Sequence, residues 1–133
     1  MSRENVDVVL EGIRRFQASD FEDVARLWQP DSWITGPEGW PEPGPFEGRE
    51  AVIAQFRRLA EDWGENRFPD TRVVADRGDW VVVALRWEVR GGRSGVVTTA
   101  DIGAAYRLRD GRMCEGHFRW TAAEALEAAG LAE

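Results

Sequence analysis

The strongest constraint on the fold is a run of four strand-like segments in the second half of the chain, separated by very short turn sequences. The segments are rich in Val, Ile and aromatic residues, a composition typical of β-strands. The separators, residues 76–79, 91–95 and 110–111, are rich in Gly and Asp and too short for a crossover, so they predict antiparallel neighbours. The four segments are residues 72–75, 80–89, 96–109 and 112–120.

The first part of the chain carries two helical patterns. Apolar residues at helical spacing, with Ser2 available as an N-cap, predict a first helix. Ser19 and Glu22 form an S-x-x-E capping box, which predicts that a second helix opens there and closes at Pro30. The apolar positions are Val6, Val9, Leu10, Ile13 and Phe16 in the first helix and Phe21, Val24, Ala25 and Trp28 in the second.

Two further helices flank the strands. An apolar stripe starts after Arg49, with Gly64 as its C′ residue, and a second capping box at Thr121 and Glu124 opens a last helix ending at Gly130. Helices followed by an antiparallel meander predict an α+β domain in which the helices cover one face of a curved sheet. The stripe consists of Val52, Ile53, Phe56, Leu59, Ala60 and Trp63.

Residues 30–48 break both patterns. They hold five of the six prolines and four glycines, and only residues 33–35 fit a short strand. A loop of this length in a compact domain is usually functional or disordered. Because Trp33, Trp40 and Phe46 give it large apolar side chains to bury, we expect an ordered flap.

Composition indicates one soluble domain. The 133 residues suffice for a single core, so residues 1–133 are expected to form one domain. The net charge of −7 disfavours nucleic acid and membrane surfaces as partners. No signal peptide is recognised, and the longest apolar run, residues 80–85, is too short to span a bilayer, so a cytoplasmic location is expected. The single cysteine, Cys114, excludes an internal disulfide and is expected to be a small buried hydrophobe.

Three stretches spread over almost the whole chain carry a family pattern. They are residues 19–31, residues 46–52 with the sequence Phe-Glu-Gly-Arg-Glu-Ala-Val, and residues 108–131, which begin Leu-Arg-Asp-Gly-Arg. This pattern resembles the SnoaL-like branch of the nuclear transport factor 2-like superfamily. The resemblance implies a cone-shaped, curved antiparallel sheet covered by N-terminal helices, with a short C-terminal helix. One pocket in that superfamily serves isomerases, cyclases, dehydratases, epoxide hydrolases and non-catalytic binders, so the resemblance specifies fold more than function.

The resemblance also implies that the isomerase machinery is absent. Ketosteroid isomerases of this superfamily use a Tyr and two acids, and these positions fall on Gly12, Gly36 and Ala104, which have no ionisable side chain. Polyketide cyclases of the SnoaL branch often carry a His next to a Trp or Asp on the last strand. Here His117 lies nearby and is followed by Phe118.

Arg86 and Glu88 are the first candidates for catalysis. They resemble an Arg–Asp pair of limonene epoxide hydrolases, and their spacing places them on one face of a strand. Arg86 would hold the Glu88 carboxylate ionised, so that it can accept a proton from water or substrate. The second Asp of that set would fall on Phe118, and the alternative is a solvated ion pair on the outer sheet face. The alternating set from Val81 to Val89 is the more apolar one and favours this alternative.

His117 is the third catalytic candidate, because imidazole has an unperturbed pKa near neutrality. Its strand position favours solvent or a partner chain over the interior. With no second histidine, neither a His-based metal site nor another cofactor is expected, and a cluster of carboxylates is the open alternative for a metal. The inward set of this strand would be Cys114, Gly116, Phe118 and Trp120, and the outward set Met113, Glu115, His117 and Arg119.

Aromatic side chains predict an apolar pocket inside the cone, the alternative being that they simply fill it. We expect a protein that binds a small hydrophobic molecule and acts on it by general acid–base chemistry, as a cyclase, isomerase or epoxide-hydrolase-like enzyme. The alternative is a non-catalytic binding or interaction protein. Apolar residues on both faces of residues 80–89 predict a homodimer through the sheet. The candidate substrate-binding residues are Trp33, Trp40, Thr98, Tyr106, Phe118 and Trp120.

Overall fold

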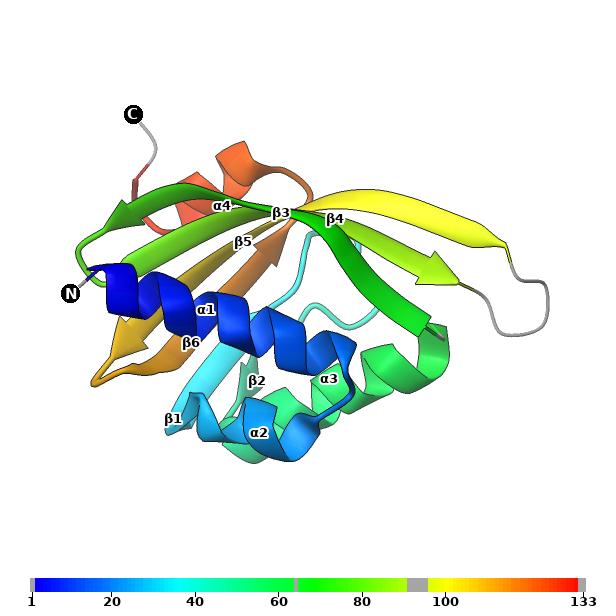
Figure 1. The fold of residues 1–133 in the computed structure, drawn as a ribbon, viewed down its shortest axis with the longest axis horizontal. Helices are drawn as coiled ribbons and strands as arrows, with labels where there is room; N and C mark the ends of the chain where they lie inside the picture. The colour runs from blue at the N-terminus through cyan, green and yellow to red at the C-terminus, as the bar shows by residue number, and fades with distance from the viewer. Residues whose placement is uncertain (1, 64, 91–95, 132–133) are drawn as a thin grey trace.

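A computed structural model describes residues 2–63, 65–90 and 96–131 of the chain and has the expected α+β architecture (Figure 1). Six strands form one curved sheet in the order β2-β1-β6-β5-β4-β3. All neighbours are antiparallel except β1 and β6, which run parallel. The elements are α1 (Ser2–Gln17), α2 (Phe21–Arg26), β1 (Trp28–Thr35), β2 (Phe46–Glu47), α3 (Arg49–Trp63), β3 (Glu65–Arg77), β4 (Trp80–Arg90), β5 (Val97–Arg109), β6 (Arg112–Arg119) and α4 (Ala122–Ala128).

The sheet has helices on both faces, but unequally. Helices α1, α2 and α3 lie on one face, called here the inner face, and the short α4 lies on the opposite, outer face (Figure 1). The main core fills the space between the inner face and the first three helices. A small outer core, around Val82, Ala105, Ala125 and Ala129, fixes α4 on the sheet. The expected arrangement of a curved sheet covered by N-terminal helices is therefore confirmed.

The capping box predicted at the start of the second helix is wrong. Asp20, not Ser19, occupies the N-cap position of α2, and its side chain makes no capping hydrogen bond. Ser19 has a φ of 58° and belongs to the end of α1, because its N–H donates to the Phe16 carbonyl at 2.9 Å. A residue committed to closing one helix in the left-handed region cannot also cap the next.

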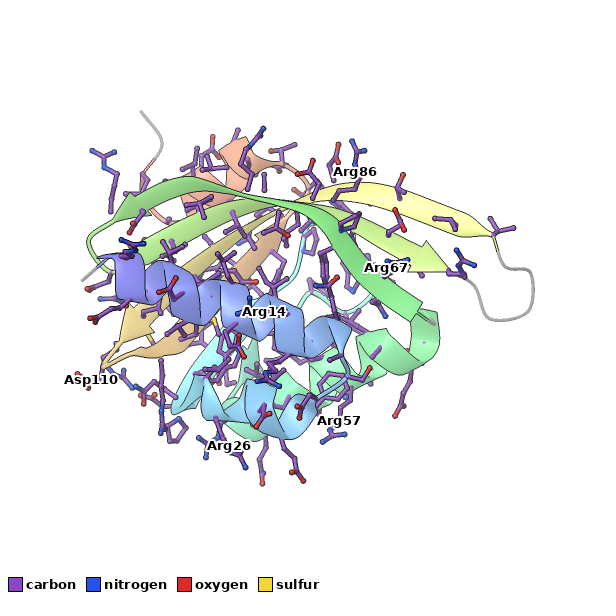
Figure 2. The ribbon with its side chains drawn as sticks, in the orientation of Figure 1. Arg14, Arg26, Arg57, Arg67, Arg86 and Asp110 are labelled. Atoms are coloured by element: carbon purple, nitrogen blue, oxygen red, sulfur yellow. The ribbon has the colours of Figure 1, made fainter. Side chains whose placement is uncertain are left out.

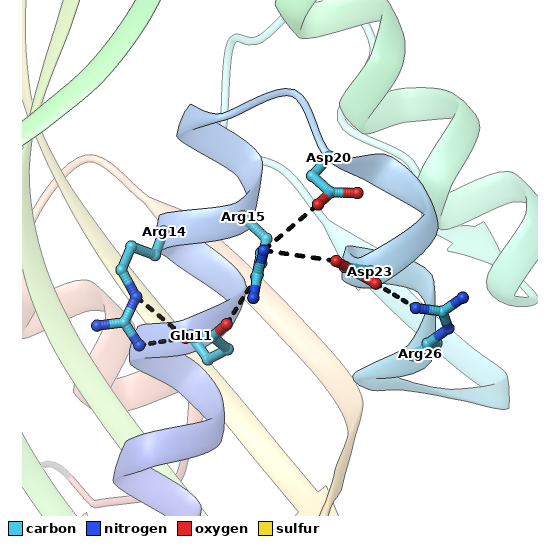
Figure 3. A network of polar contacts seen from close by, with 6 residues as sticks. All are labelled: Glu11, Arg14, Arg15, Asp20, Asp23 and Arg26. Carbon is cyan, nitrogen blue, oxygen red and sulfur yellow. Dashed lines mark hydrogen bonds and ion pairs between the residues drawn. The ribbon is translucent and has the colours of Figure 1, made fainter.

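An ion-pair network joins α1 to α2 in place of that cap (Figure 3). The Arg15 guanidinium is 2.7 Å from the Glu11 carboxylate within α1 and reaches Asp20 at 3.4 Å and Asp23 at 3.5 Å. Arg14 and Arg26 pair with Glu11 and Asp23 at the two ends of the network. The side chains of this network are 30–73 % exposed, so its ion pairs contribute little to the free energy of unfolding.

The second helix ends earlier than its sequence pattern predicts, and a strand takes its place. Helix α2 stops at Arg26, and β1 starts at Trp28 rather than at Trp33. Pairing with β6 outweighs the local signal of Pro30, which lies where the β1–β6 register shifts and no ladder N–H is needed. Pro30 therefore does not end a helix but lies within β1.

The remaining loop, residues 36–45, forms the expected flap. Its two ends are joined by the Gly36 N–H, which donates to the Pro43 carbonyl at 2.6 Å. Gly39 and Gly44 adopt positive φ angles of 83° and 85°, which a glycine reaches without steric cost.

The later strands β4, β5 and β6 agree with the predicted segments to within one residue at each end, and β3 is the exception. Strand β3 is much longer than residues 72–75, and the last helix has the predicted cap, with Thr121 Oγ1 accepting the Glu124 N–H at 3.1 Å. The C′ position at residue 64 and the turn at residues 91–95 lie outside the described residues.

The predicted faces of the last strand are correct at one end and reversed at the other. Gly116 and Phe118 point to the inner side as expected. Met113 is 1 % exposed in the main core, whereas the buried Cys114 borders a polar cleft on the other side of the sheet. One extra residue in β6 explains the reversal: the register passes from Arg107 opposite Glu115 to Leu108 opposite Met113, which leaves Cys114 between them and exchanges the faces.

Candidate functional site

A cavity of about 120 Å³ lies between the inner face of the sheet, the helices α1 and α3, and the flap. Its wall is almost entirely apolar, and aromatic side chains dominate it. Residues of the flap and of the far end of β6 close it on one side. The lining residues include Val9, Ile13, Phe16, Trp28, Ile34, Trp40, Gln55, Phe56, Leu59, Phe68, Leu85, Trp87, Ile102, Tyr106, Met113 and Phe118.

Four aromatic residues in this wall contact one another in a closed ring. Trp28 lies 5.7 Å from Phe56 and 6.1 Å from Tyr106, between ring centroids. Phe118 lies 6.2 Å from Phe56 and 5.9 Å from Tyr106. The tilted and edge-to-face geometry of these contacts is the favourable one for aromatic pairs. The ring gives the cavity a shape set by large, stiff side chains.

Two polar groups in the wall lack a protein partner. The Tyr106 side chain is 6 % exposed, and its hydroxyl makes no hydrogen bond to any residue that the structure describes. Burial raises the pKa of Tyr106 far above its ordinary value, so the phenol stays neutral. Gln55 is 5 % exposed, and its Oε1 accepts two bonds from Arg58, at 3.0 and 2.7 Å. Its Nε2 has no partner within the described ranges.

The flap is held over the cavity from two sides. Trp40 lies between Trp87 and Trp120, with ring centroids 5.9 Å away in each case. The Trp120 Nε1–H donates to the Glu38 carbonyl at 2.8 Å. On the side of α3, Arg58 lies 3.7 Å from the Glu42 carboxylate and stacks over the Phe46 ring. Widening this side of the cavity requires the flap to leave these contacts.

The outer face carries a polar cluster around His117, which is 6 % exposed although it faces away from the cavity. Its ring lies between Trp33 and Trp80, at 4.9 and 6.0 Å between centroids. Nδ1 is 2.8 Å from Thr35 Oγ1, and Nε2 is 3.0 Å from a Glu115 oxygen.

The direction of these bonds follows from Arg119 and Arg107. Arg119 Nη1 donates to Thr35 Oγ1 at 2.9 Å, so the Thr35 hydroxyl proton is free to point at Nδ1 of His117. His117 Nε2 then carries the ring proton and donates to Glu115, whose other oxygen accepts from Arg107 at 3.1 Å. All polar side chains of this cluster are therefore satisfied within the protein.

The structure brings only part of the predicted site together. Trp40, Tyr106 and Phe118 line the cavity. Trp33 lies on the outer face beside His117, and Thr98 is exposed on β5, beyond the cavity wall. Trp120 is 38 % exposed and reaches the site only through its contacts with the flap.

Arg86 and Glu88 also lie away from the cavity. Leu85 and Trp87, their neighbours on β4, line it, so the alternating residues occupy the outer face. Arg86 extends to the side opposite the first three helices and lies 3.7 Å from the exposed Asp101 carboxylate (Figure 2). Glu88 is half-buried on the same face. This is the outer-face placement that the apolar alternation of the strand favours.

Gln55 is the wall residue that sequence reasoning missed. It lies one position before Phe56, inside the apolar stripe of α3. A polar residue at helical spacing between Val52 and Leu59 breaks that stripe, and this is the signal that could have found it.

Neither a metal cluster nor a membrane span is found in the described part of the chain. No three His, Cys, Asp or Glu side chains within it gather closely enough to hold a metal ion. None of its helices has the length and apolarity needed to cross a bilayer.

Comparison with known protein families assigns the chain to a family. A profile of the SnoaL-like domain matches residues 9–116. The chain therefore belongs to the SnoaL-like domain family, within the nuclear transport factor 2-like fold. No curated protein matches the sequence.

Solved structures agree with this fold over nearly the whole chain. TerC, co-crystallised with polyporic acid, is 23% identical, with 93% of this chain and 96% of TerC covered and a TM-score of 0.77. A candidate SnoaL-like polyketide cyclase from Jannaschia sp. CCS1 is 23% identical, with coverages of 98% and 94% and a TM-score of 0.75. A candidate isomerase from Bacillus subtilis is 16% identical, with coverages of 98% and 95% and a TM-score of 0.75. At these identities the likeness establishes the fold alone.

Proposed function

We propose that the protein binds a small, predominantly apolar molecule in the cavity between the sheet and the helices α1 and α3. The observation that carries this proposal is a cavity of about 120 Å³ whose wall is almost wholly apolar and aromatic. Apolar cavities of about 150 Å³ hold benzene, whereas drug-sized ligands need roughly 300 Å³ or more. A single small ring therefore matches a cavity of this volume.

Benzene tests this proposal directly. Saturating benzene should raise the melting temperature of the wild-type protein, because a ligand that binds only the folded state stabilises it. Leu59→Phe should reduce that rise, since the larger side chain on α3 takes up cavity volume. Trp33→Phe, on the outer face, is the matched control and should preserve the rise. An equal rise in the Leu59→Phe variant, or none in the wild type, would contradict the proposal.

Acid–base catalysis on the bound molecule is the second candidate function. It is favoured by one observation: Thr35 lies in the cavity wall and also hydrogen-bonds to His117, which Glu115 orients from the other side. A hydroxyl, an imidazole and a carboxylate in sequence can pass a proton between the cavity and the outer face. The names of the Jannaschia and Bacillus structures, a cyclase and an isomerase, agree with such chemistry.

Proton exchange at a simple ketone tests this second candidate. In D2O, the protein should accelerate loss of the α-protons of cyclohexanone, followed by NMR, and His117→Asn should abolish the acceleration. Exchange no faster than in buffer, or loss of exchange in Glu88→Gln instead, would overturn the assignment to His117.

The homodimer and the cytoplasmic location stay predictions. Helix α4 already covers Val82, one of the apolar outer-face residues that suggested dimerisation. Sedimentation that finds only 15.0 kDa particles would contradict a dimer.

A further inference from the structure

The cavity wall is largely apolar, and two hydrogen-bond donors in it, the Tyr106 hydroxyl and the Gln55 amide, have no protein partner among the described residues. Tyr106 projects from β5 among Trp28 and Phe118, so its hydroxyl lies in an aromatic surrounding. Buried polar groups nearly always have a partner, and leaving one without is costly. The Tyr106 hydroxyl lies in the cavity wall without a protein partner among the described residues, so it is available to a molecule that enters the cavity.

Gln55 supplies the second donor, and its orientation is fixed by chemistry. The Arg58 guanidinium has only N–H groups, so the carboxamide must turn its oxygen to Arg58. The amide Nε2, with two N–H donors, is then left on the remaining side of a side chain that is 5 % exposed and lines the cavity. Gln55 can therefore donate to a ligand but has its acceptor occupied.

The wall also limits the charge of the ligand. Glu42 is the one ionisable carboxylate in it, lies in the exposed flap and faces Arg58 at 3.7 Å. No Arg lines the cavity within the described residues. Moving an ion from water into such a site without a counter-charge is far more costly than moving a neutral group.

We propose that Tyr106 and Gln55 select an uncharged, largely apolar ring compound that carries an acceptor oxygen, a carbonyl or an ether. The inference rests on the proposed binding function and names the class of ligand. The apolar wall holds the ring, and the two donors hold the oxygen. A hydrocarbon of the same shape leaves both donors without a partner.

A pair of probes of equal shape separates these contributions. Cyclohexanone and methylenecyclohexane differ only in C=O against C=CH2, and titration calorimetry gives their dissociation constants. Wild-type protein should bind the ketone at least as tightly as the more apolar alkene. Tyr106→Phe should weaken ketone binding about 3- to 10-fold and leave alkene binding unchanged. Gln55→Met should weaken ketone binding in the same direction.

Ser32→Ala is the matched control. Ser32 also has a buried hydroxyl without a partner among the described residues, but it lies outside the cavity wall, so its removal should change neither affinity. Unchanged ketone affinity in both Tyr106→Phe and Gln55→Met would overturn the assignment of the donors while leaving the binding site intact. Failure of both probes to bind the wild type would instead overturn the binding function itself, and this inference with it.

Discussion

The two faces of the sheet treat their polar groups in opposite ways. On the outer face, the buried His117 and the half-buried Glu115 form a chain of short hydrogen bonds that ends at Thr35, at the edge of the cavity. On the inner face, Tyr106 and Gln55 keep donors without a protein partner in an apolar cavity. The cluster around His117, whose residue types suggest catalysis, therefore has its hydrogen bonds satisfied within the protein. The unsatisfied groups mark the surface on which a ligand would complete the structure.

The largest expected effect comes from a glycine that brings α4 against the outer face. A Cβ at Gly103 would lie 2.3 Å from the Thr121 carbonyl oxygen, which is backbone and cannot turn away. Gly103→Ala should lower the free energy of unfolding by at least about 3 kcal/mol, the upper part of the range for overpacking. Urea denaturation measures it.

Gly116→Ala is the inner-face counterpart. Its Cβ would lie 2.8 Å from the Trp28 ring and 3.2 Å from Ile34, both of them side chains of the cavity wall. Because these side chains can shift toward the cavity, we expect a cost of only about 1–2 kcal/mol. If both variants lose the same free energy of unfolding, the side chains of the inner face adjust no better to an added methyl group than the backbone at α4.

The expected effect of His117→Ala lies between those of the two glycine variants. It removes two hydrogen bonds and leaves the half-buried Glu115 carboxylate with Arg107 as its remaining donor. We expect the free energy of unfolding to fall by about 2–3 kcal/mol, the usual cost of breaking bonds to a partly buried charged group. The measurement is again urea denaturation, and a loss below 1 kcal/mol would show that the outer cluster contributes little to stability.

Tyr106→Phe should behave in the opposite way. The hydroxyl has no protein partner among the described residues, so its removal breaks no internal bond and keeps the ring contacts with Trp28 and Phe118. We expect stability without ligand to be unchanged or raised by up to about 1 kcal/mol. A clear loss in thermal unfolding would mean that this hydroxyl is structural, like the groups of the outer face.

The smallest effect is expected at an exposed ion pair. A hydrogen bond from Arg109, 2.6 Å away, lowers the pKa of Asp31 below its ordinary value. A lowered pKa in the folded state adds stability above the unfolded pKa of about 3.9, and this stability is lost as the pH falls through the folded value. Asp31→Asn should therefore be slightly less stable than the wild type at pH 6.

The acid limb of the unfolding curve checks this. Once the pH falls below the lowered folded pKa of Asp31, the difference between Asp31→Asn and wild type should vanish, because both side chains are then uncharged. Asp70→Asn serves as the control, since Asp70 has no ion pair among the described residues. A difference that grows on acidification would have the wrong sign for this account.

The sequence predicted the elements whose pattern is local. The stripe of α3, the capped α4 and the meander from β3 to β6 all follow from spacing and turn residues, and the fold class followed from their order. The sequence predicted only the end of β1, residues 33–35, and missed its first part because the pairing partner β6 lies about 80 residues away in sequence, a distance that no local pattern reports. The faces of Met113 and Cys114 were predicted wrongly because an extra residue in β6 exchanges them.

The candidate site was predicted only in part, for a related physical reason. Arg86, Glu88 and His117 were chosen as catalytic candidates because their side chains are ionisable. Whether such side chains reach a cavity depends on which face of the sheet the helices cover. Tyr106 and Phe118 were found because alternation along a strand does report a common face. Gln55 was missed, although its polar side chain interrupts an apolar helical stripe.

The most direct test of the contrast between the faces is an NMR titration with cyclohexanone that follows the tryptophan indole N–H signals, assigned through single Trp→Phe variants. Trp28, Trp40 and Trp87 line the cavity, whereas Trp33 and Trp80 contact His117 on the outer face. We expect the indole N–H signals of the first three to shift on addition of the ketone and the chemical shifts of Trp33 and Trp80 to remain unchanged. Shifts confined to Trp33 and Trp80 would contradict it and place the ligand site on the outer face.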